Sequence, residues 1–140
     1  EAAQPGNSYT LGSAKFEILG PVADDAESLN NMSAVLMLTF EGKKFLFTGD
    51  AEKEEEQEIL AEGRGLDCDV LKVGHHGSKT SSSADFLAAA TPDICVIECG
   101  ADNDYGHPHK QALERIKEYT SEIYRTDICG YSYHLLGRGA

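Results

Sequence analysis

The chain has 140 residues, of which 41% are hydrophobic and 26% are charged, and its formal net charge is -12. This composition indicates one globular domain or a part of one, and it excludes disordered, collagen-like and coiled-coil classes. No apolar run reaches the ~18 residues of a membrane-spanning helix. A surface this acidic repels nucleic acid unless a bound metal ion or a small basic patch attracts it.

The first half of the chain is predicted to be mainly β-structure. Short apolar segments alternate there with glycine-containing turns, which is the pattern of β-hairpins. The predicted strands are residues 9–11, 15–19, 33–40 and 43–48. We expect the first two of these to form one hairpin around residues 12–13, and the third and fourth to pair as a second hairpin in the centre of a sheet.

The second half alternates strands with helices. The predicted helices are residues 51–62, 83–89 and 108–119, and the predicted strands are residues 69–73, 93–98, 122–125 and 131–136. Ser82 and Asp85 resemble a capping box for the second helix, and Pro108 suits the first position of the third. This alternation predicts an α/β fold in which helices cover a mixed sheet.

The first predicted helix is unusually acidic. Five glutamates fall within seven residues: Glu52, Glu54, Glu55, Glu56 and Glu58. Such a run is typical of a helix face in contact with water, and these glutamates are expected to face solvent.

The four cysteines are Cys68, Cys95, Cys99 and Cys129, and none belongs to a C-x-x-C pair. This spacing gives no support to a zinc ribbon or to a thioredoxin-like motif. We therefore expect free, buried thiols.

Three predicted strands are followed by polar residues that can carry chemistry. These segments are residues 48–50 (TGD), 74–81 (GHHGSKTS) and 102–109 (DNDYGHPH). In α/β sheets, ligands bind on the loops beyond the strand ends. Carboxylate oxygen together with imidazole nitrogen is a ligand set for zinc or manganese.

Each of these residues also has a purely structural alternative. Asp50 precedes a predicted helix and could act only as its N-cap. His107 could cap the helix that Pro108 begins. His75 and His76 are harder to explain in this way, because two adjacent imidazoles lie between glycines directly after an apolar strand. A ligand or catalytic role is favoured for this pair.

The two remaining histidines are assigned no ligand role. His109 lies in the first turn of a predicted helix, where the helix dipole disfavours a cation, and is expected to be neutral. His134 lies in the last predicted strand without polar neighbours and is interpreted as structural.

Four strings, taken together, resemble a known family. They are residues 30–33 (NNMS), 45–52 (FLFTGDAE), 70–81 (VLKVGHHGSKTS) and 105–109 (YGHPH). They are similar to the C-terminal part of the metallo-β-lactamase-like domain of the ComEC family of DNA-internalisation competence proteins, and to soluble ComEC-like hydrolases. The resemblance covers residues 30 to about 126. The order TGD, HHGSKTS, YGHPH makes it specific, whereas TGD alone would carry no information.

The resemblance implies a four-layer αββα sandwich with a site for one or two metal ions between the sheet edges. Asp50 matches the aspartate that bridges the metals. His75 or His76 matches the late histidine ligand, with His76 favoured and His75 beside it. His107 and Ser78, with His75, match positions of catalytic interest near the site, where they could hold a leaving-group oxygen or a phosphate.

One departure from the family is decisive. The defining HxHxDH string, which precedes TGD in the family and supplies most of the ligands, is absent, and no histidine precedes His75. Residues 1–140 are therefore expected to be a single domain or fragment that corresponds to the C-terminal half of the family's domain. Because each metal needs about four ligands, the chain alone is expected to be inactive or nearly so. Zinc or manganese is expected in the complete domain and need not be bound here.

An alternative keeps one zinc within this chain, held by Asp50, His75, His76 and His107. By resemblance, the complete domain is a metal-dependent phosphodiesterase, a nuclease acting on DNA during natural transformation. The alternative function is a non-catalytic module that binds a partner or scaffolds a membrane DNA channel.

The resemblance also implies the partners and the location. The expected partners are DNA and the missing N-terminal half of the domain, and an exposed apolar face could instead form a homodimer. The expected location is a domain of a bacterial membrane protein that does not itself insert into the bilayer, or a cytoplasmic or secreted hydrolase.

Overall fold

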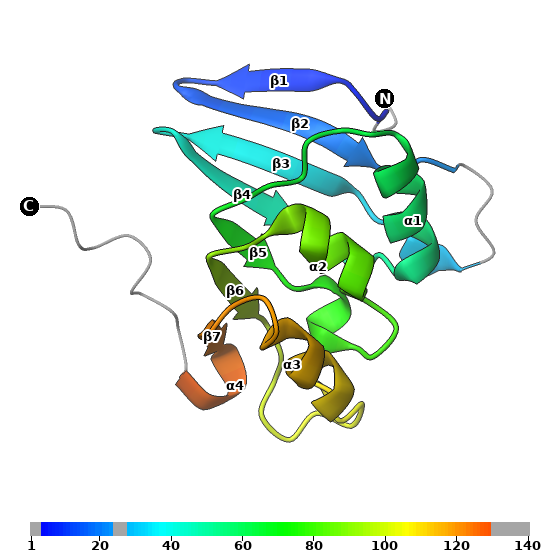
Figure 1. Cartoon of the computed structure of the whole chain (residues 1–140), viewed down its shortest axis with the longest axis vertical. Helices are drawn as coiled ribbons and strands as arrows, with labels where there is room; N and C mark the ends of the chain where they lie inside the picture. The colour runs from blue at the N-terminus through cyan, green and yellow to red at the C-terminus, as the bar shows by residue number, and fades with distance from the viewer. Residues whose placement is uncertain (1–3, 24–27, 130–140) are drawn as a thin grey trace, which may run out of the picture.

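The computed structural model describes residues 4–23 and 28–129. These residues form one seven-stranded mixed sheet in the order β1-β2-β3-β4-β5-β6-β7 (Figure 1). The strands are β1 Ser8–Leu11, β2 Ala14–Gly20, β3 Val35–Phe40, β4 Lys43–Phe47, β5 Val70–Lys72, β6 Ile94–Ile97 and β7 Glu122–Arg125. The helices are α1 Lys53–Ala61, α2 Ala84–Ala90, α3 Lys110–Ile116 and α4 Thr126–Cys129, with 3-10 turns η1 Leu29–Met32 and η2 Gly74–Gly77. The predicted α/β class is confirmed.

Strands β1 to β4 are antiparallel, and tight turns connect two pairs of them. β1 and β2 pair from Leu11 with Ala14, and β3 and β4 pair from Phe40 with Lys43. The second turn consists of Glu41 and Gly42, both with positive φ (49° and 77°). Positive φ at both central residues is typical of the type I′ turns that suit the twist of paired strands. Both predicted hairpins are confirmed.

Strands β4 to β7 are parallel, and a helix lies between each consecutive pair along the chain. Parallel neighbours need such crossovers. One consequence decides where a site can form: the carboxyl ends of β4, β5 and β6 lie side by side at one edge of the sheet.

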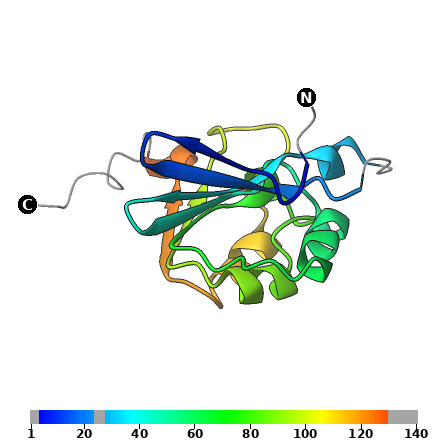
Figure 2. The same ribbon diagram turned by 90° about the horizontal axis from the view of Figure 1, so that it is seen from above.

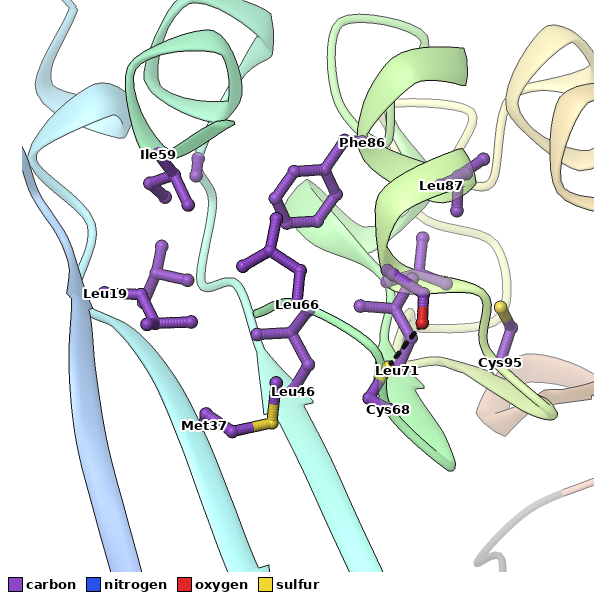
Figure 3. Close-up of a cluster of buried hydrophobic side chains, with 14 of the residues drawn as sticks. Leu19, Met37, Leu46, Ile59, Leu66, Cys68, Leu71, Phe86, Leu87 and Cys95 are labelled. Atoms are coloured by element: carbon purple, nitrogen blue, oxygen red, sulfur yellow. Dashed lines mark hydrogen bonds between the residues drawn. The ribbon is translucent and has the colours of Figure 1, made fainter. Parts of the chain in front are cut away.

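The main core lies between the sheet and helices α1, α2 and α3, which lie on the same face of it (Figures 1 and 2). Leu46 and Leu71 point from the sheet toward Ile59 of α1 and toward Phe86 and Leu87 of α2 (Figure 3), and all five are fully buried. Each such side chain contributes about 1.5–3 kcal/mol through burial.

The opposite face of the sheet is also apolar. Side chains alternate along a strand, and cross-strand partners share a face. Leu38 pairs with Phe16 and Phe45, and Leu36 pairs with Phe47, so these five lie on the face away from the core. Phe47 remains 39% exposed. Aromatic and aliphatic side chains of β2, β3 and β4 thus form a continuous, partly exposed surface, which we call the open face.

The prediction that the glutamates of the first helix face water is wrong for two of them. Glu55 and Glu56 are each 1% exposed. Burial raises the pKa of Glu55 to about 7, although its carboxylate accepts a hydrogen bond from the Val22 N–H. Burial also raises the pKa of Glu56, against the hydrogen bonds that its carboxylate accepts.

The predicted capping box is also wrong. The N-cap of α2 is Ser83, whose side chain makes no capping bond, and Ser82 has a positive φ of 54°. The backbone N–H groups of Ser82 and Ser83 instead donate to the carboxylate of Glu56 on α1. A buried carboxylate from a neighbouring helix therefore caps α2.

The third helix begins later than predicted. Its N-cap is His109 and its first residue is Lys110, because the His109 N–H donates to the Gly77 carbonyl and holds this segment in an extended conformation. Ala112 and Ile116 of α3 are fully buried, as the predicted apolar face requires.

The cysteines are free thiols: Cys68 and Cys95 are buried, Cys99 is half-buried and Cys129 is exposed. The expectation of burial is thus correct for two of the four. The predicted strand 131–136 and His134 lie outside the described residues. Across residues 4–23 and 28–129, every helix is too short or too polar to cross a bilayer.

Candidate functional site

The three polar segments come together, as the parallel order of β4, β5 and β6 requires. The Nε2 atom of His76, which follows β5, lies 3.6 Å from an Asp50 carboxylate oxygen beyond β4. The ring of His107, which follows β6, lies 5.4 Å from that of His75 and 6.3 Å from that of His76, between centroids.

Asp50 is held in place through its backbone. Its N–H donates to the Ser33 hydroxyl at 3.0 Å. Gly49 has a positive φ of 54°, and a Cβ there would lie 2.9 Å from the Cβ of Ser33, so only glycine fits. The Gly49 carbonyl accepts from the His75 N–H and from the Lys72 ammonium, whose pKa is lowered by burial. This carbonyl therefore ties the Asp50 segment to β5 and to the histidine pair.

His75 and His76 both have a left-handed backbone, with φ of 45° and 55°. This conformation is strained for a non-glycine residue and is commonly retained where function requires it. The Nδ1 atom of His76 lies 2.6 Å from the Glu98 carbonyl oxygen. A carbonyl only accepts, so Nδ1 carries a proton, and in the neutral ring the lone pair is on Nε2, which faces Asp50. A backbone carbonyl orients metal-binding histidines in the same way, which favours His76 as the ligand.

Glu52 is a site residue that the sequence pattern missed. Glu52, not Asp50, is the N-cap of α1, so the N-cap alternative for Asp50 is wrong. Its carboxylate lies 3.5 Å from Nδ1 of His75 and accepts from the hydroxyls of Thr80 and Ser28. Burial acts to raise the pKa of Glu52, but these hydrogen bonds outweigh it and the pKa is lowered. The one signal in the sequence was a carboxylate two residues after Asp50.

His107 is fixed by Asn103. The Asn103 side chain accepts from the His107 N–H and donates to its carbonyl. The pKa of His107 is lowered, first by burial and then by the neighbouring imidazoles, so the ring is neutral at neutral pH. The N-cap of α3 is His109, so the alternative that His107 caps this helix is wrong.

Gly77 allows the third segment to approach the second. Its φ is 82°, and a Cβ there would lie 2.6 Å from the Cβ of Pro108. Next to this contact, the Lys79 N–H donates to Nδ1 of His109 at 3.0 Å. That nitrogen therefore carries no proton, as in the neutral ring expected for His109.

Ser78 is buried and faces Thr80 rather than Asp50. The two hydroxyl oxygens lie 2.9 Å apart, and the Thr80 hydroxyl in turn donates to Glu52. Ser78 therefore begins a short hydrogen-bonded series that ends at the carboxylate beside His75.

The donor set suits part of a metal site but does not complete one. Asp50 and His76 present an oxygen and a nitrogen to the same space, as zinc and manganese require. Within the described part of the chain, however, no three His, Cys, Asp or Glu side chains are placed to hold one ion. This argues against the alternative in which Asp50, His75, His76 and His107 share a single zinc.

Comparison with known proteins identifies the family of this chain. Residues 27–100 match the metallo-beta-lactamase superfamily. The chain is 38% identical over 130 residues to ComE operon protein 3 of Bacillus subtilis, covering 93% of this chain and 17% of that protein. It is 39% identical over 115 residues to Recombination protein 2 of Haemophilus influenzae, covering 82% of this chain and 14% of that protein. It is 37% identical over 125 residues to Competence protein ComA of Neisseria gonorrhoeae, covering 89% of this chain and 18% of that protein.

The chain thus spans less than a fifth of each of these relatives. The family match covers more than half of the chain, from residue 27 to residue 100, and includes the TGD and GHHGSKTS strings. The chain therefore belongs to the metallo-beta-lactamase superfamily, and its resemblance to the ComEC family of competence proteins is confirmed over most of its length.

Proposed function

We propose that this chain is the C-terminal portion of a metal-dependent phosphodiesterase that acts on DNA during uptake. The observation that carries the proposal is the pair formed by Asp50 and His76, in which a carbonyl-oriented imidazole nitrogen faces a carboxylate at the carboxyl ends of neighbouring parallel strands. The competence proteins to which the chain is similar favour DNA as the substrate.

Asp50 and His76 would hold a zinc or manganese ion in the complete domain. A bound ion supplies the Lewis acidity that phosphodiester hydrolysis needs. The remaining ligands, about two or more for each ion, would come from the part of the domain that carries the HxHxDH string. The neutral ring of His107 is available to hold a phosphate or leaving-group oxygen. For Ser78, the contacts favour a positioning role through Thr80 and Glu52.

A basic groove next to the site offers a place for DNA phosphates. Lys53, Lys79 and Arg115 line a cavity of about 270 Å³, together with Asp85. Among the described residues, no carboxylate forms an ion pair with Lys53 or Lys79, in contrast to the paired Lys43. The chain as a whole has a net charge of -12 and repels DNA. Lysines without a carboxylate partner can attract the phosphate backbone locally.

The open face is proposed to contact the rest of the same domain. It exposes Phe47 and carries apolar side chains from three strands, and a sheet face of this kind is normally covered. The family resemblance, with its two packed sheets, supports the preceding half of the domain as the partner. A second copy of the chain is the alternative partner. Sedimentation measures the oligomeric state of the extended and unextended chains: a dimer of the extended chain would favour the second copy, and a monomer would favour the preceding half of the domain.

The test is to compare the 140-residue chain with a chain extended upstream to include the HxHxDH string. We expect metal-dependent cleavage of single-stranded DNA by the extended chain only, and a loss of about 100-fold or more in Asp50→Ala. Asp67→Ala removes an exposed carboxylate elsewhere and serves as the control. Cleavage at the same rate by the unextended chain would contradict the proposal.

The alternative is a non-catalytic module of a membrane DNA channel. The observation that favours it is the incomplete ligand set among the described residues. DNA binding by the extended chain without metal-dependent cleavage would establish this function instead. In either case the parent is proposed to be a bacterial membrane protein whose membrane-spanning part lies outside these residues.

A further inference from the structure

A long loop connects β6 to α3 (Figure 1). A cavity of about 400 Å³ adjoins the candidate site beside this loop. His76 and His107 form part of its wall, and Tyr105, Asn103 and Glu98 form another part. The volume is within the range of pockets that bind small organic groups. His76 and His107 have roles in the proposed metal and phosphate site, whereas Tyr105, Asn103 and Glu98 have none in it.

Three aromatic rings lie in series at the edge of this cavity. The Tyr105 and His107 rings are 5.7 Å apart with an interplanar angle of 21°, and the His107 and His76 rings are 6.3 Å apart at 24°. The outermost ring, Tyr105, is 79% exposed. A nearly parallel series that ends in an exposed tyrosine extends from the candidate ligand into solvent.

The loop that presents Tyr105 is held in a defined shape. Asn103 bonds to both backbone groups of His107, and its amide also donates to the Gly100 carbonyl at 2.9 Å. Tyr105 lies between Asn103 and His107, so these bonds fix its backbone on both sides. Because the Tyr105 ring is so exposed, it contributes little to the stability of the core. Packing therefore does not explain why an aromatic side chain occupies this position.

The charge around the cavity selects the kind of ligand. Glu98 lines it, and Asp102 and Asp104 are exposed on the same loop. These carboxylates repel a phosphate but not an uncharged aromatic group. Stacking on exposed aromatic side chains is how proteins bind the bases of single-stranded nucleic acid regardless of sequence.

We propose that this cavity binds a nucleobase of single-stranded DNA, with Tyr105 as the stacking platform. The inference rests on the proposed function, because it assumes that DNA reaches the Asp50 and His76 pair. The base would lie against the Tyr105 ring, while its phosphates extend toward the site and away from the acidic loop. Tyr105 is a binding residue and takes no part in bond cleavage.

The test uses the 140-residue chain, a fluorescent single-stranded oligonucleotide, and an oligonucleotide of the same length in which every base is absent. Fluorescence anisotropy is measured at low salt with chelator present, so that metal binding plays no part. We expect Tyr105→Ala to weaken binding of the normal oligonucleotide about tenfold, from the loss of one stacked base. Binding of the abasic oligonucleotide should not change.

Two further variants control for indirect effects. Tyr105→Phe keeps the ring and should bind within about twofold of the original chain. Tyr9 is the matched control, because it is also exposed (44%) and stacks on an aromatic ring, Phe16, at 5.5 Å and 25°, but it lies on β1. Tyr9→Ala should leave binding unchanged.

The outcomes are distinct. Equal weakening of both oligonucleotides in Tyr105→Ala would show a backbone contact only and overturn the proposal, as would no change or no measurable binding by the chain. Failure of the proposed function would give a different result. The extended chain would then show no metal-dependent cleavage, but it would still bind the normal oligonucleotide more tightly than the abasic one and would lose this preference in Tyr105→Ala.

Discussion

Two of the segments with a left-handed backbone adopt it for different reasons. In the turn between β3 and β4, Glu41 and Gly42 have φ of 49° and 77°, and the geometry of a two-residue hairpin accounts for both. After β5, His75 and His76 have φ of 45° and 55°, and no hairpin is formed there. In the antiparallel region, the left-handed residues form a tight turn. After β5, they orient the side chains of His75 and His76 toward Glu52 and Asp50.

The largest expected effect separates the two imidazoles. In the chain extended to include the HxHxDH string, His76→Ala should weaken manganese or zinc binding about 100-fold or more, because it removes a ligand atom. His75→Ala should weaken it only about tenfold, because this ring faces Glu52 and acts through its neighbours. Isothermal titration measures both, and the reverse order would show that His75 is the ligand.

Two glycines with nearly the same φ separate backbone strain from close packing. A Cβ added at Gly42 (φ 77°) would meet no atom within 4 Å, whereas one added at Gly77 (φ 82°) would lie 2.6 Å from Pro108. Gly42→Ala should therefore lower the free energy of unfolding by about 1 kcal/mol, from strain alone. Gly77→Ala adds a clash and should lower it by about 2–3 kcal/mol.

Urea denaturation measures this pair of variants. In the extended chain, Gly77→Ala should also weaken metal binding, since the clash moves the His107 segment away from the histidine pair. Equal losses of stability in the two variants would show that the third segment is not held by this contact.

A third comparison concerns buried and exposed carboxylates on α1. The folded-state pKa of Glu55 is about 7, above its ordinary value of 4.5, so the folded chain binds the proton more tightly than the unfolded chain. Stability is therefore greatest at or below pH 4.5 as far as Glu55 is concerned, and it falls as the pH rises to about 7. The loss is on the order of 3 kcal/mol, because one pKa unit corresponds to about 1.4 kcal/mol.

Glu55→Gln should remove this decline, because the amide oxygen can still accept from Val22 and never ionises. Glu54→Gln, on the same helix but exposed, should keep it. Unfolding midpoints in urea at a series of pH values test the prediction. A decline of the same size in Glu55→Gln would assign it to another group.

One physical reason explains which features of the fold and the site could be predicted from the sequence and which could not. The hairpins, the α/β alternation and the polar residues at three strand ends depend on turn residues and apolar periodicity, which are local. The cap that Glu56 gives to Ser82, and the contact of Glu52 with Thr80, join residues 26 and 28 positions apart. Such contacts exist only after the sheet has placed α1 beside the later loops.

The same reason explains the misplaced start of α3. Pro108 is a good first residue for a helix, but the Gly77 carbonyl takes the His109 N–H and postpones the helix. The histidine pair was recognisable because its oddity is local: two imidazoles between glycines. The incomplete ligand set was recognisable for the same reason, since the missing string is a property of the sequence itself.

The smallest expected effect compares two exposed lysines, one in each region. Lys79 lines the basic groove near the site, whereas Lys15 lies on β2 at the hairpin end of the sheet. Each phosphate contact that is lost reduces the dependence of DNA affinity on salt by about one unit of slope. Lys79→Glu should therefore weaken binding of single-stranded DNA severalfold at low salt and flatten its salt dependence, and Lys15→Glu should do neither. Because the two substitutions change the net charge equally, equal effects would mean that the acidic chain attracts or repels DNA only as a whole. A difference between them would show that the backbone of the DNA passes along the parallel half of the sheet, next to Asp50 and His76.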